Sequence, residues 1–315
     1  MGQTDSQTPF KTSIGGQAIL EGIMMRGPKK QAIVIRTPDG LVTKEEELKF
    51  VKDRYPILGL PFIRGPVNFI GMMVNGMKAI TYSAEFMPED EQVEPSKFDK
   101  WIEKRFGEKA AEKMIIGIAV VLGIALAVLL FFMLPTFLAG IFGGFVKNRI
   151  VNNLIEGFMR IAIFIVYMWL ATRLKEMQRI WAYHGAEHKT IFCYEKGLEL
   201  TVENAREQPR CHPRCGTSFM FIVMIVSILV FSVVNWTNMW VRMALRILLL
   251  PVAIAISYEI IKLAGRYENM ATRILSAPGK ALQRLTTMEP DDEMLEVAIE
   301  AIKLVIPEQA GADEW

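Results

Sequence analysis

The sequence predicts a mainly α-helical membrane protein with four transmembrane helices, a small N-terminal cytosolic β unit and a cytosolic metal-binding loop. Hydrophobic residues make up 51% of the 315 residues. Four apolar segments are close to the length that crosses a bilayer, and the histidines and cysteines gather in one short stretch. The formal net charge is only +2, so no nucleic-acid partner is expected.

The first 56 residues have the pattern of a small cytosolic β unit. The pair Gly15-Gly16, the apolar run 32–35 and the turn Pro38-Asp39-Gly40 follow one another as strands and hairpins do. The first twelve residues are polar and lack the basic and apolar run that opens a signal peptide. No cleaved presequence is therefore expected.

An amphipathic segment and a linker precede the first long apolar stretch. Residues 57–87 are rich in methionine and aliphatic side chains, but Asn75, Lys78 and several glycines interrupt them. We expect this segment to lie on the membrane surface or to re-enter the membrane. The alternative is a soluble helix that packs on the β unit. Residues 88–112 have the composition of an acidic, proline-containing linker followed by a cytosolic helix.

Residues 113–262 are expected to form a four-helix membrane domain. Its apolar segments are 114–134, 154–170, 219–234 and 243–261. In the second segment, Glu156 and Arg160 lie four residues apart, where they can neutralise each other on one helical face. The third segment is short but uncharged.

The basic residues beside the apolar segments predict the orientation. Five lie in residues 100–113 and eight in the 173–218 connection, whereas the two opposite loops hold three. Positive charge favours the inner side, so both termini and the 173–218 loop are expected in the cytoplasm. The protein is expected to be multi-pass in a bacterial cytoplasmic (inner) membrane. Residues 263–315 would form a cytosolic helical tail, whose amphipathic stretch 290–305 docks on the cytosolic part or on a partner.

All three histidines and all three cysteines fall between residues 184 and 215. This grouping predicts a transition-metal site, with zinc as the expected ion. Two of the histidines lie one helical turn apart and can face one ion, and two of the cysteines flank a proline-containing turn. Cys193 would point away from this face and be buried as an apolar residue. The expected ligands are His184, His188, Cys211 and Cys215, with His212 as the main substitute.

The number of protein ligands decides the chemistry of such a site. Three ligands leave a position for water, and Glu187 would then be the catalytic base; the H-x-x-E-H spacing is that of inverted zinc proteases. Four ligands make a structural site, in which Glu187 orients a ligand imidazole. The sequence leaves both readings open. Glu21 and Glu259 are further carboxylates that could approach the ion, although Glu259 could instead pair with Lys262.

Three motifs in order give the chain a resemblance to a known family. They run from Gly15 to Pro28, from His184 to Lys189 and from His212 to Phe219. Together they resemble the YqhQ-like family of uncharacterised bacterial membrane proteins, and the resemblance extends over nearly the whole chain. It implies a membrane protein that is predicted to be a metal-dependent enzyme, without an established substrate or catalytic residue.

Two functions are expected from these features. The first is a metal-dependent enzyme, such as a hydrolase, that acts on a membrane-associated substrate at the cytosolic face. The second is a non-catalytic scaffold or accessory factor for membrane-protein insertion or assembly, in which zinc staples the 173–218 loop to the β unit. The expected partners are the lipid bilayer, a membrane protein or the translocation machinery, and a second copy of the chain in a homo-oligomer.

Overall fold

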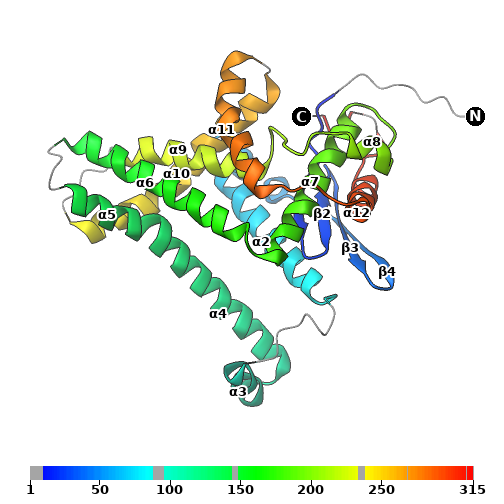
Figure 1. Ribbon diagram of the computed structural model, residues 1–315, viewed down its shortest axis with the longest axis horizontal. Helices are drawn as coiled ribbons and strands as arrows, with labels where there is room; N and C mark the ends of the chain where they lie inside the picture. Colours follow the sequence, from blue (N-terminus) through cyan, green and yellow to red (C-terminus); the bar gives the residue numbers. More distant parts are fainter. Residues whose placement is uncertain are drawn as a thin grey trace, which may run out of the picture. The chain divides into compact units, whose positions relative to one another are not determined.

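The computed structural model describes residues 10–87, 96–143, 148–232, 238–267, 269–309 and 311–314 (Figure 1). The described chain is mostly helical, with one small antiparallel sheet near its N-terminus. It forms two compact units. Unit 1 comprises Met1–Met87, Met168–Ser227 and Leu249–Trp315, and unit 2 comprises Pro88–Tyr167 and Ile228–Leu248.

Helices make up most of the described chain. In unit 1 they are α1 (Val51–Arg54), the 3-10 turn η1 (Pro56–Gly59), α2 (Arg64–Ala84), α7 (Lys175–Glu195), α8 (Val202–Arg206), α11 (Met270–Thr286) and α12 (Asp292–Lys303). Unit 2 holds α3 (Lys97–Phe106), α4 (Glu108–Val128), the π-helical turn η3 (Leu129–Met133) and α5 (Leu134–Gly143). Three apolar helices have residues in both units: α6 (Arg149–Ala171), α9 (Gly216–Ser232) and α10 (Met239–Arg266).

The N-terminal pattern of unit 1 forms the predicted small β sheet. Its strands pair antiparallel in the order of the chain: β1 (Gly15–Ile19), β2 (Gly22–Arg26), β3 (Lys30–Thr37) and β4 (Gly40–Glu47). The register pairs Ile19 with Gly22 and Thr37 with Gly40, so two connections are two-residue hairpins. Gly40 has a φ of 126°, which glycine adopts without steric cost.

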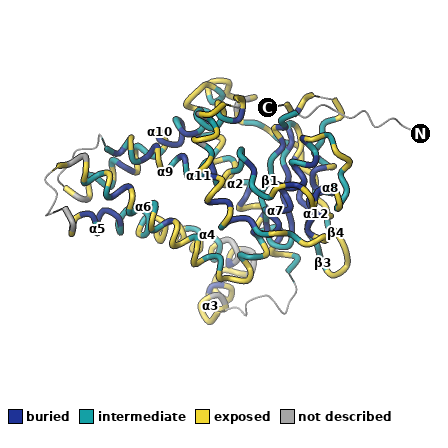
Figure 2. Tube along the Cα trace, turned by 45° about the horizontal axis from the view of Figure 1, so that its top comes forward, coloured by how far each residue is buried: buried dark blue, intermediate teal, exposed yellow. Residues whose placement is uncertain are grey.

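Helices cover both faces of this sheet. Successive side chains of a strand point to opposite faces, so Ile23 and Met24 of β2 enter two different cores. Ile23 is buried with residues of α7 and α12. Met24 is buried with Ala79 of α2. Figure 2 shows much of the strands, α7 and α12 as buried, so the sheet is the middle layer of this part of unit 1.

Helix α7 lies at the centre of unit 1. Twelve of its residues between Trp181 and Glu195 are buried, so the helix is enclosed on all sides over this length. Helix α12 packs against α7 and against β2 and β3. Its first turn is capped by Asp291, whose side chain accepts the Met294 N–H at 2.8 Å. The amphipathic stretch 290–305 thus docks on the part of unit 1 that holds the sheet, while the cytosolic location of this part stays a prediction.

A buried polar network joins the helices of unit 2. Glu156 of α6 accepts a hydrogen bond from Thr136 Oγ1 at 2.6 Å and pairs with Arg246 of α10. The predicted pairing of Glu156 with Arg160 is present, with 3.6 Å between Oε1 and Nη2. Arg160 Nε also donates to the Phe131 carbonyl at 2.8 Å. That carbonyl lies four residues before Pro135, which has no N–H to offer it.

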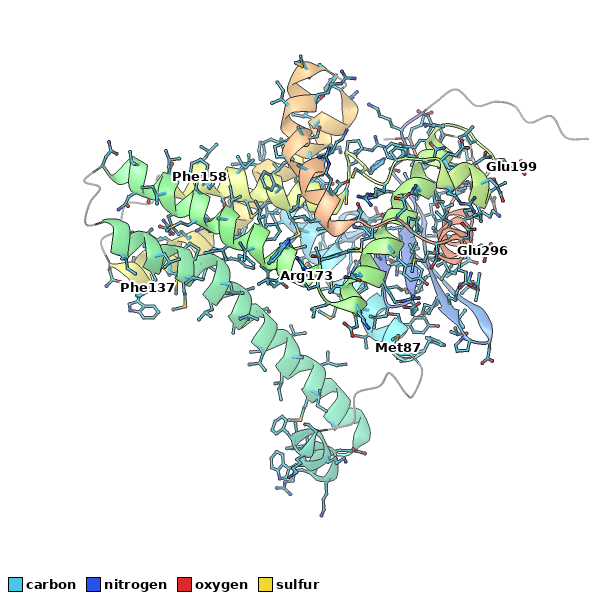
Figure 3. All side chains as sticks on the ribbon, viewed as in Figure 1. Met87, Phe137, Phe158, Arg173, Glu199 and Glu296 are labelled. Carbon is cyan, nitrogen blue, oxygen red and sulfur yellow. The ribbon has the colours of Figure 1, made fainter. Side chains whose placement is uncertain are left out.

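Three helices are long and apolar enough to cross a membrane, by length and composition: Met114–Ile141, Val151–Ala171 and Trp240–Arg266. Helix α9 is apolar but has only 17 residues, and the last two residues of the predicted 219–234 span lie outside the described residues. A fourth span therefore stays a prediction. Apolar side chains on these helices are widely exposed; Phe137 and Phe158, labelled in Figure 3, are 59% and 67% exposed. Exposed apolar surface of this kind is typical of an interaction site or a membrane contact.

Leu295→Ala is expected to destabilise unit 1, because Leu295 of α12 is fully buried in the core shared with α7. The truncation leaves a cavity and costs about 2–5 kcal/mol, which thermal unfolding of the purified protein in detergent measures. Leu198→Ala is the matched control, because Leu198 is 40% exposed; its change stays within about 0.5 kcal/mol. Equal losses in the two variants would contradict this packing of α12.

Candidate metal centre

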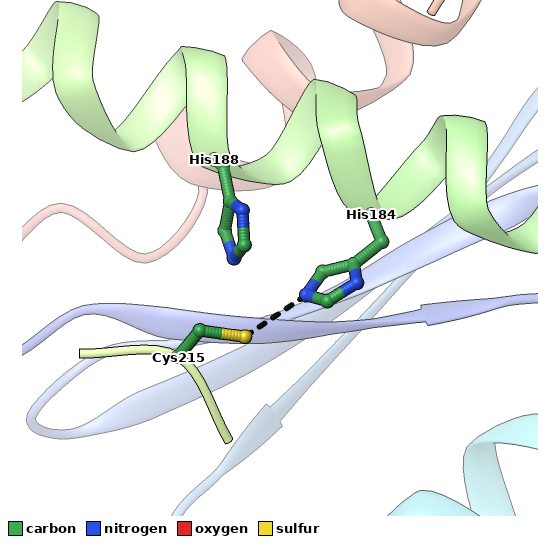
Figure 4. A group of neighbouring side chains, drawn as sticks. All are labelled: His184, His188 and Cys215. Atoms are coloured by element: carbon green, nitrogen blue, oxygen red, sulfur yellow. Dashed lines mark hydrogen bonds between the residues drawn. The ribbon is translucent and has the colours of Figure 1, made fainter. Parts of the chain in front are cut away.

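Three side chains of types that can bind a metal converge in unit 1. His184 and His188 lie one turn apart on α7 and point toward Cys215, the residue immediately before α9 (Figure 4). One potential ligand atom of each lies within 4.8 Å of the other two. His184 Nε2 is 3.1 Å from Cys215 Sγ, and the two imidazole centroids are 4.3 Å apart. Among the described residues, these three form the group of His, Cys, Asp or Glu side chains whose ligand atoms are close enough together to hold one metal ion.

Backbone carbonyls orient both imidazoles. His184 Nδ1 lies 2.8 Å from the Thr286 oxygen, and His188 Nδ1 lies 2.6 Å from the Arg210 oxygen. Because a carbonyl only accepts, each Nδ1 carries a proton, and a neutral ring then has its lone pair on Nε2. Nε2 of His188 is buried and has no hydrogen-bond partner among the described residues. This is the orientation that a second layer of hydrogen bonds gives to metal-ligating imidazoles.

The electrostatics of the cluster favour the thiolate form of Cys215. Burial opposes ionisation, but the charges of His184 and His188 and the hydrogen bond of His184 hold the pKa of the thiol well below its usual range. Burial likewise lowers the pKa of His184, but the charge of Cys215 outweighs it and raises that pKa to about 9. The thiolate is the form of cysteine that binds a metal, so Cys215 is prepared for this role. His184 would release its Nε2 proton when an ion binds, because only a neutral imidazole is a ligand.

Glu187 lies beside the three residues and reaches toward the sheet. Its Oε1 accepts the Gly16 N–H of β1 at 2.9 Å, while its Oε2 is buried without a partner in the described part of the chain. Burial raises the pKa of the Glu187 carboxyl, although the positive charges of His184 and His188 oppose it. A buried carboxyl with a raised pKa and one free oxygen beside a ligand cluster is suited to take up a proton and release it again.

A glutamine of α11 fixes the segment that carries Cys215. Gln283 is fully buried; its Oε1 accepts the His212 N–H at 2.7 Å, and its Nε2 donates to the His212 carbonyl at 2.8 Å. The same Nε2 lies 2.8 Å from Ser218 Oγ. Sequence reasoning missed both Gln283 and the Thr286 carbonyl. The signal for Gln283 was a polar residue on the buried face of an amphipathic helix, beside Leu282.

The structure does not bring His212 or Cys211 into the ligand group. His212 Nε2 faces Glu195 Oε2 at 3.4 Å, and its Nδ1 accepts the Arg214 N–H at 3.3 Å. Both ring nitrogens are thus engaged, and burial lowers the pKa of His212 to about 4. Cys211 is a half-buried free thiol outside the group. Of the five predicted ligands, the three that come together are His184, His188 and Cys215.

Glu195 ties this neighbourhood to both ends of the described chain, and sequence reasoning did not single it out. Its carboxylate pairs with Arg214 and accepts the Thr12 N–H at 2.9 Å. Thr12 Oγ1 in turn donates to Asp313 Oδ2 at 2.5 Å. The loop before α9 is therefore fixed by the contacts of Glu195 with Arg214 and His212 as well as by Gln283.

The remaining predicted residues lie outside the ligand group. Cys193 is fully buried in the core, as the helical period predicts. Glu259 pairs with Arg64, with 2.8 Å between Oε1 and Nε. Glu21, in the β1–β2 turn at a φ of 47°, pairs with Arg179 of α7.

Comparisons with known proteins agree with the resemblance seen in the motifs. Residues 60–308 match a family described as protein of unknown function (DUF1385). The uncharacterised protein YqhQ of Bacillus subtilis (strain 168) is 33% identical over 307 residues, which cover 95% of this chain and 94% of that protein. No solved structure matches. The three clustered residues and Glu187 all lie in the matched segment.

Gly16→Ala is expected to disturb the contact between β1 and Glu187. A Cβ on Gly16 would lie 2.8 Å from the Met24 oxygen and 3.0 Å from the Glu187 Cδ. This overpacking costs about 1–3 kcal/mol, measured as a loss of thermal stability in detergent. Gly15→Ala is the control, because a Cβ there meets nothing within 4 Å. A Gly16→Ala protein as stable as wild type would contradict this contact.

Proposed function

The chain belongs to the DUF1385 family, described as proteins of unknown function, and we propose that it is a membrane-bound metalloprotein that hydrolyses a membrane-associated substrate. The observation that carries the proposal is the pair of imidazoles whose Nδ1 atoms are held by the Thr286 and Arg210 carbonyls beside Cys215. Two separate backbone segments thus turn both Nε2 atoms toward one place. This is stronger support than the proximity of three side chains alone.

Zinc is the ion that this donor set fits best. Two imidazole nitrogens and a thiolate are ligands that zinc prefers, at about 2.0–2.1 Å and 2.3 Å. Magnesium and calcium prefer oxygen ligands. The buried Nε2 of His188 lacks a hydrogen-bond partner among the described residues, and a bound ion would coordinate its lone pair. The raised thiolate fraction of Cys215 supports the same assignment.

Three protein ligands favour a catalytic centre over a structural one. Zinc in such a site leaves a coordination position for water and lowers the pKa of that water to about 7. In the proposed reaction, Glu187 takes the proton of the attacking water on its free Oε2. The Gly16 N–H holds the other carboxylate oxygen at 2.9 Å. Because burial raises the pKa of Glu187, the proton is held well enough to be passed on to a leaving group.

We assign the protein to the bacterial cytoplasmic membrane, multi-pass, with both termini and the metal centre on the cytoplasmic side. The three long apolar helices and the basic residues near their ends support this assignment. Cys215 directly precedes the apolar helix α9, which we propose as the fourth span. A substrate that is a lipid, or is anchored in the bilayer, would reach a centre at the end of such a helix without leaving the membrane.

A zinc-stapled scaffold is the second candidate. It is favoured by the number of segments that meet at the centre, because α7, the segment before α9 and the end of α11 all contribute. Such a protein would be an accessory factor for membrane-protein insertion or assembly, alone or as a homo-oligomer. A structural site needs a closed shell, and Cys211 is the candidate for its fourth ligand.

Cys215→Ser is expected to lose the metal, because the substitution removes the one thiolate of the cluster. Mass-spectrometric metal analysis of the purified protein should show zinc per chain reduced at least about tenfold. Cys211→Ser is the matched control and keeps its zinc. If Cys211→Ser loses zinc as fully as Cys215→Ser, the shell has four ligands and the scaffold is favoured. A wild-type protein that binds no transition metal refutes both candidates.

Glu187→Gln is expected to keep zinc but to lower turnover about 10²–10⁴-fold, because the amide cannot accept the proton. The purified protein is incubated with membrane extract from cells that lack it, and the consumption of extract components is followed by mass spectrometry. Glu199→Gln, at an exposed position, is the control. The wild-type rate should decrease as the pH is lowered, because the base must be deprotonated. The decrease should begin at a higher pH than for an ordinary glutamate, because burial raises the pKa of Glu187. Unchanged turnover in Glu187→Gln would exclude this residue as the base.

A further inference from the structure

Helix α11 presents a second feature, a row of basic side chains on its exposed face. We propose that Arg273, Lys280 and Arg284 form a binding surface for the headgroups of anionic lipids at the cytoplasmic face of the bilayer. The three residues are named the α11 basic row below. The proposal goes beyond the metal centre and requires no metal to be bound there.

The spacing of the α11 basic row places its members on one line along the helix. Arg273 and Lys280 are seven residues apart and Lys280 and Arg284 are four apart, close to two turns and one turn. All three side chains are exposed. Among the residues that the structure describes, none of the three has a carboxylate partner. Three cations that remain available on one line can contact several phosphate groups of a lipid surface at once.

Exposed apolar residues lie beside the basic row. Met270 is 74% exposed and Ile274 is 67% exposed, and the small Ala277 and Ala281 continue this line toward the C-terminus of the helix. Around the helix axis, the mean direction of these apolar residues lies less than a quarter of a turn from that of the basic row. A helix with basic and apolar residues side by side on its free face is suited to the boundary between headgroups and acyl chains.

The position and rotation of α11 support a lipid surface as the occupant. The candidate span α10 ends at Arg266, and α11 begins four residues later behind an Asn269 capping box. The start of α11 therefore lies at the level where a span leaves the hydrocarbon core. The opposite face is fixed, because Gly279 packs against Ser218 and Gln283 is bonded to His212. This packing leaves the basic row pointing outward.

Native mass spectrometry of the full-length protein in a neutral detergent tests the proposal. The protein is titrated with phosphatidylglycerol, with phosphatidylcholine of the same acyl chains, and with inorganic phosphate. Wild type is expected to prefer phosphatidylglycerol. Each substitution of Arg273, Lys280 or Arg284 by Gln should weaken that binding about fivefold and leave phosphatidylcholine binding unchanged. The preference should decline with increasing salt.

Two matched variants make the result decisive. Lys29→Gln, Lys30→Gln and Lys303→Gln together remove three exposed charges elsewhere and should leave the preference intact, and Arg273→Lys with Arg284→Lys should largely preserve it. The proposal is wrong if a variant that carries all three substitutions, Arg273→Gln, Lys280→Gln and Arg284→Gln, binds phosphatidylglycerol like wild type, or if inorganic phosphate binds as tightly as the lipid. Zinc content is measured in parallel, so a protein without zinc that keeps its lipid preference refutes only the metal centre.

Discussion

The enclosure of α7 is the constraint on which the rest of unit 1 depends. A buried polar group without a partner is costly, and several buried polar residues of α7 fix other segments of the chain. His188 holds the Arg210 carbonyl, Glu187 holds β1, and Lys189 binds the Arg206 and Gln208 carbonyls at 2.8 and 2.9 Å. One helix thus organises the sheet, the loop before α9 and the end of α11. The candidate centre is part of the same set of contacts.

The local features of the fold could be predicted from the sequence, and the long-range ones could not. Strand alternation and the Pro38-Asp39-Gly40 turn suffice for the sheet, and continuous apolar composition suffices for the long helices. For the segment that forms α2, the sequence is compatible both with a membrane segment and with a helix packed on the sheet. The structure packs Ala79 of α2 beneath Met24, yet much of its apolar surface remains exposed. Composition alone cannot separate these properties, because both draw on the same aliphatic residues.

The candidate site was predictable in its helical half only. His184, Glu187 and His188 follow from a single helical period, which also places Cys193 in the core. Cys211, His212 and Cys215 lie in a segment without regular structure, where no period says which side chain turns inward. The selection among them depends on Gln283, 71 residues from His212, which holds its backbone, and on Glu195 at the end of α7, which faces its side chain. Contacts of this kind are set by tertiary packing.

The single carboxylate of the unit 2 network has a consequence for the order of assembly. In a bilayer, α6 carries its own counter-charge, because Glu156 and Arg160 sit on one helical face. Helix α10 brings Arg246, whose partner Glu156 belongs to α6. A lone arginine within a span is costly in lipid, so in the membrane arrangement proposed above α10 would be stabilised by an α6 that is already inserted. The chain emerges from the ribosome in that sequence, and the earlier helix can act as an intramolecular chaperone for the later one.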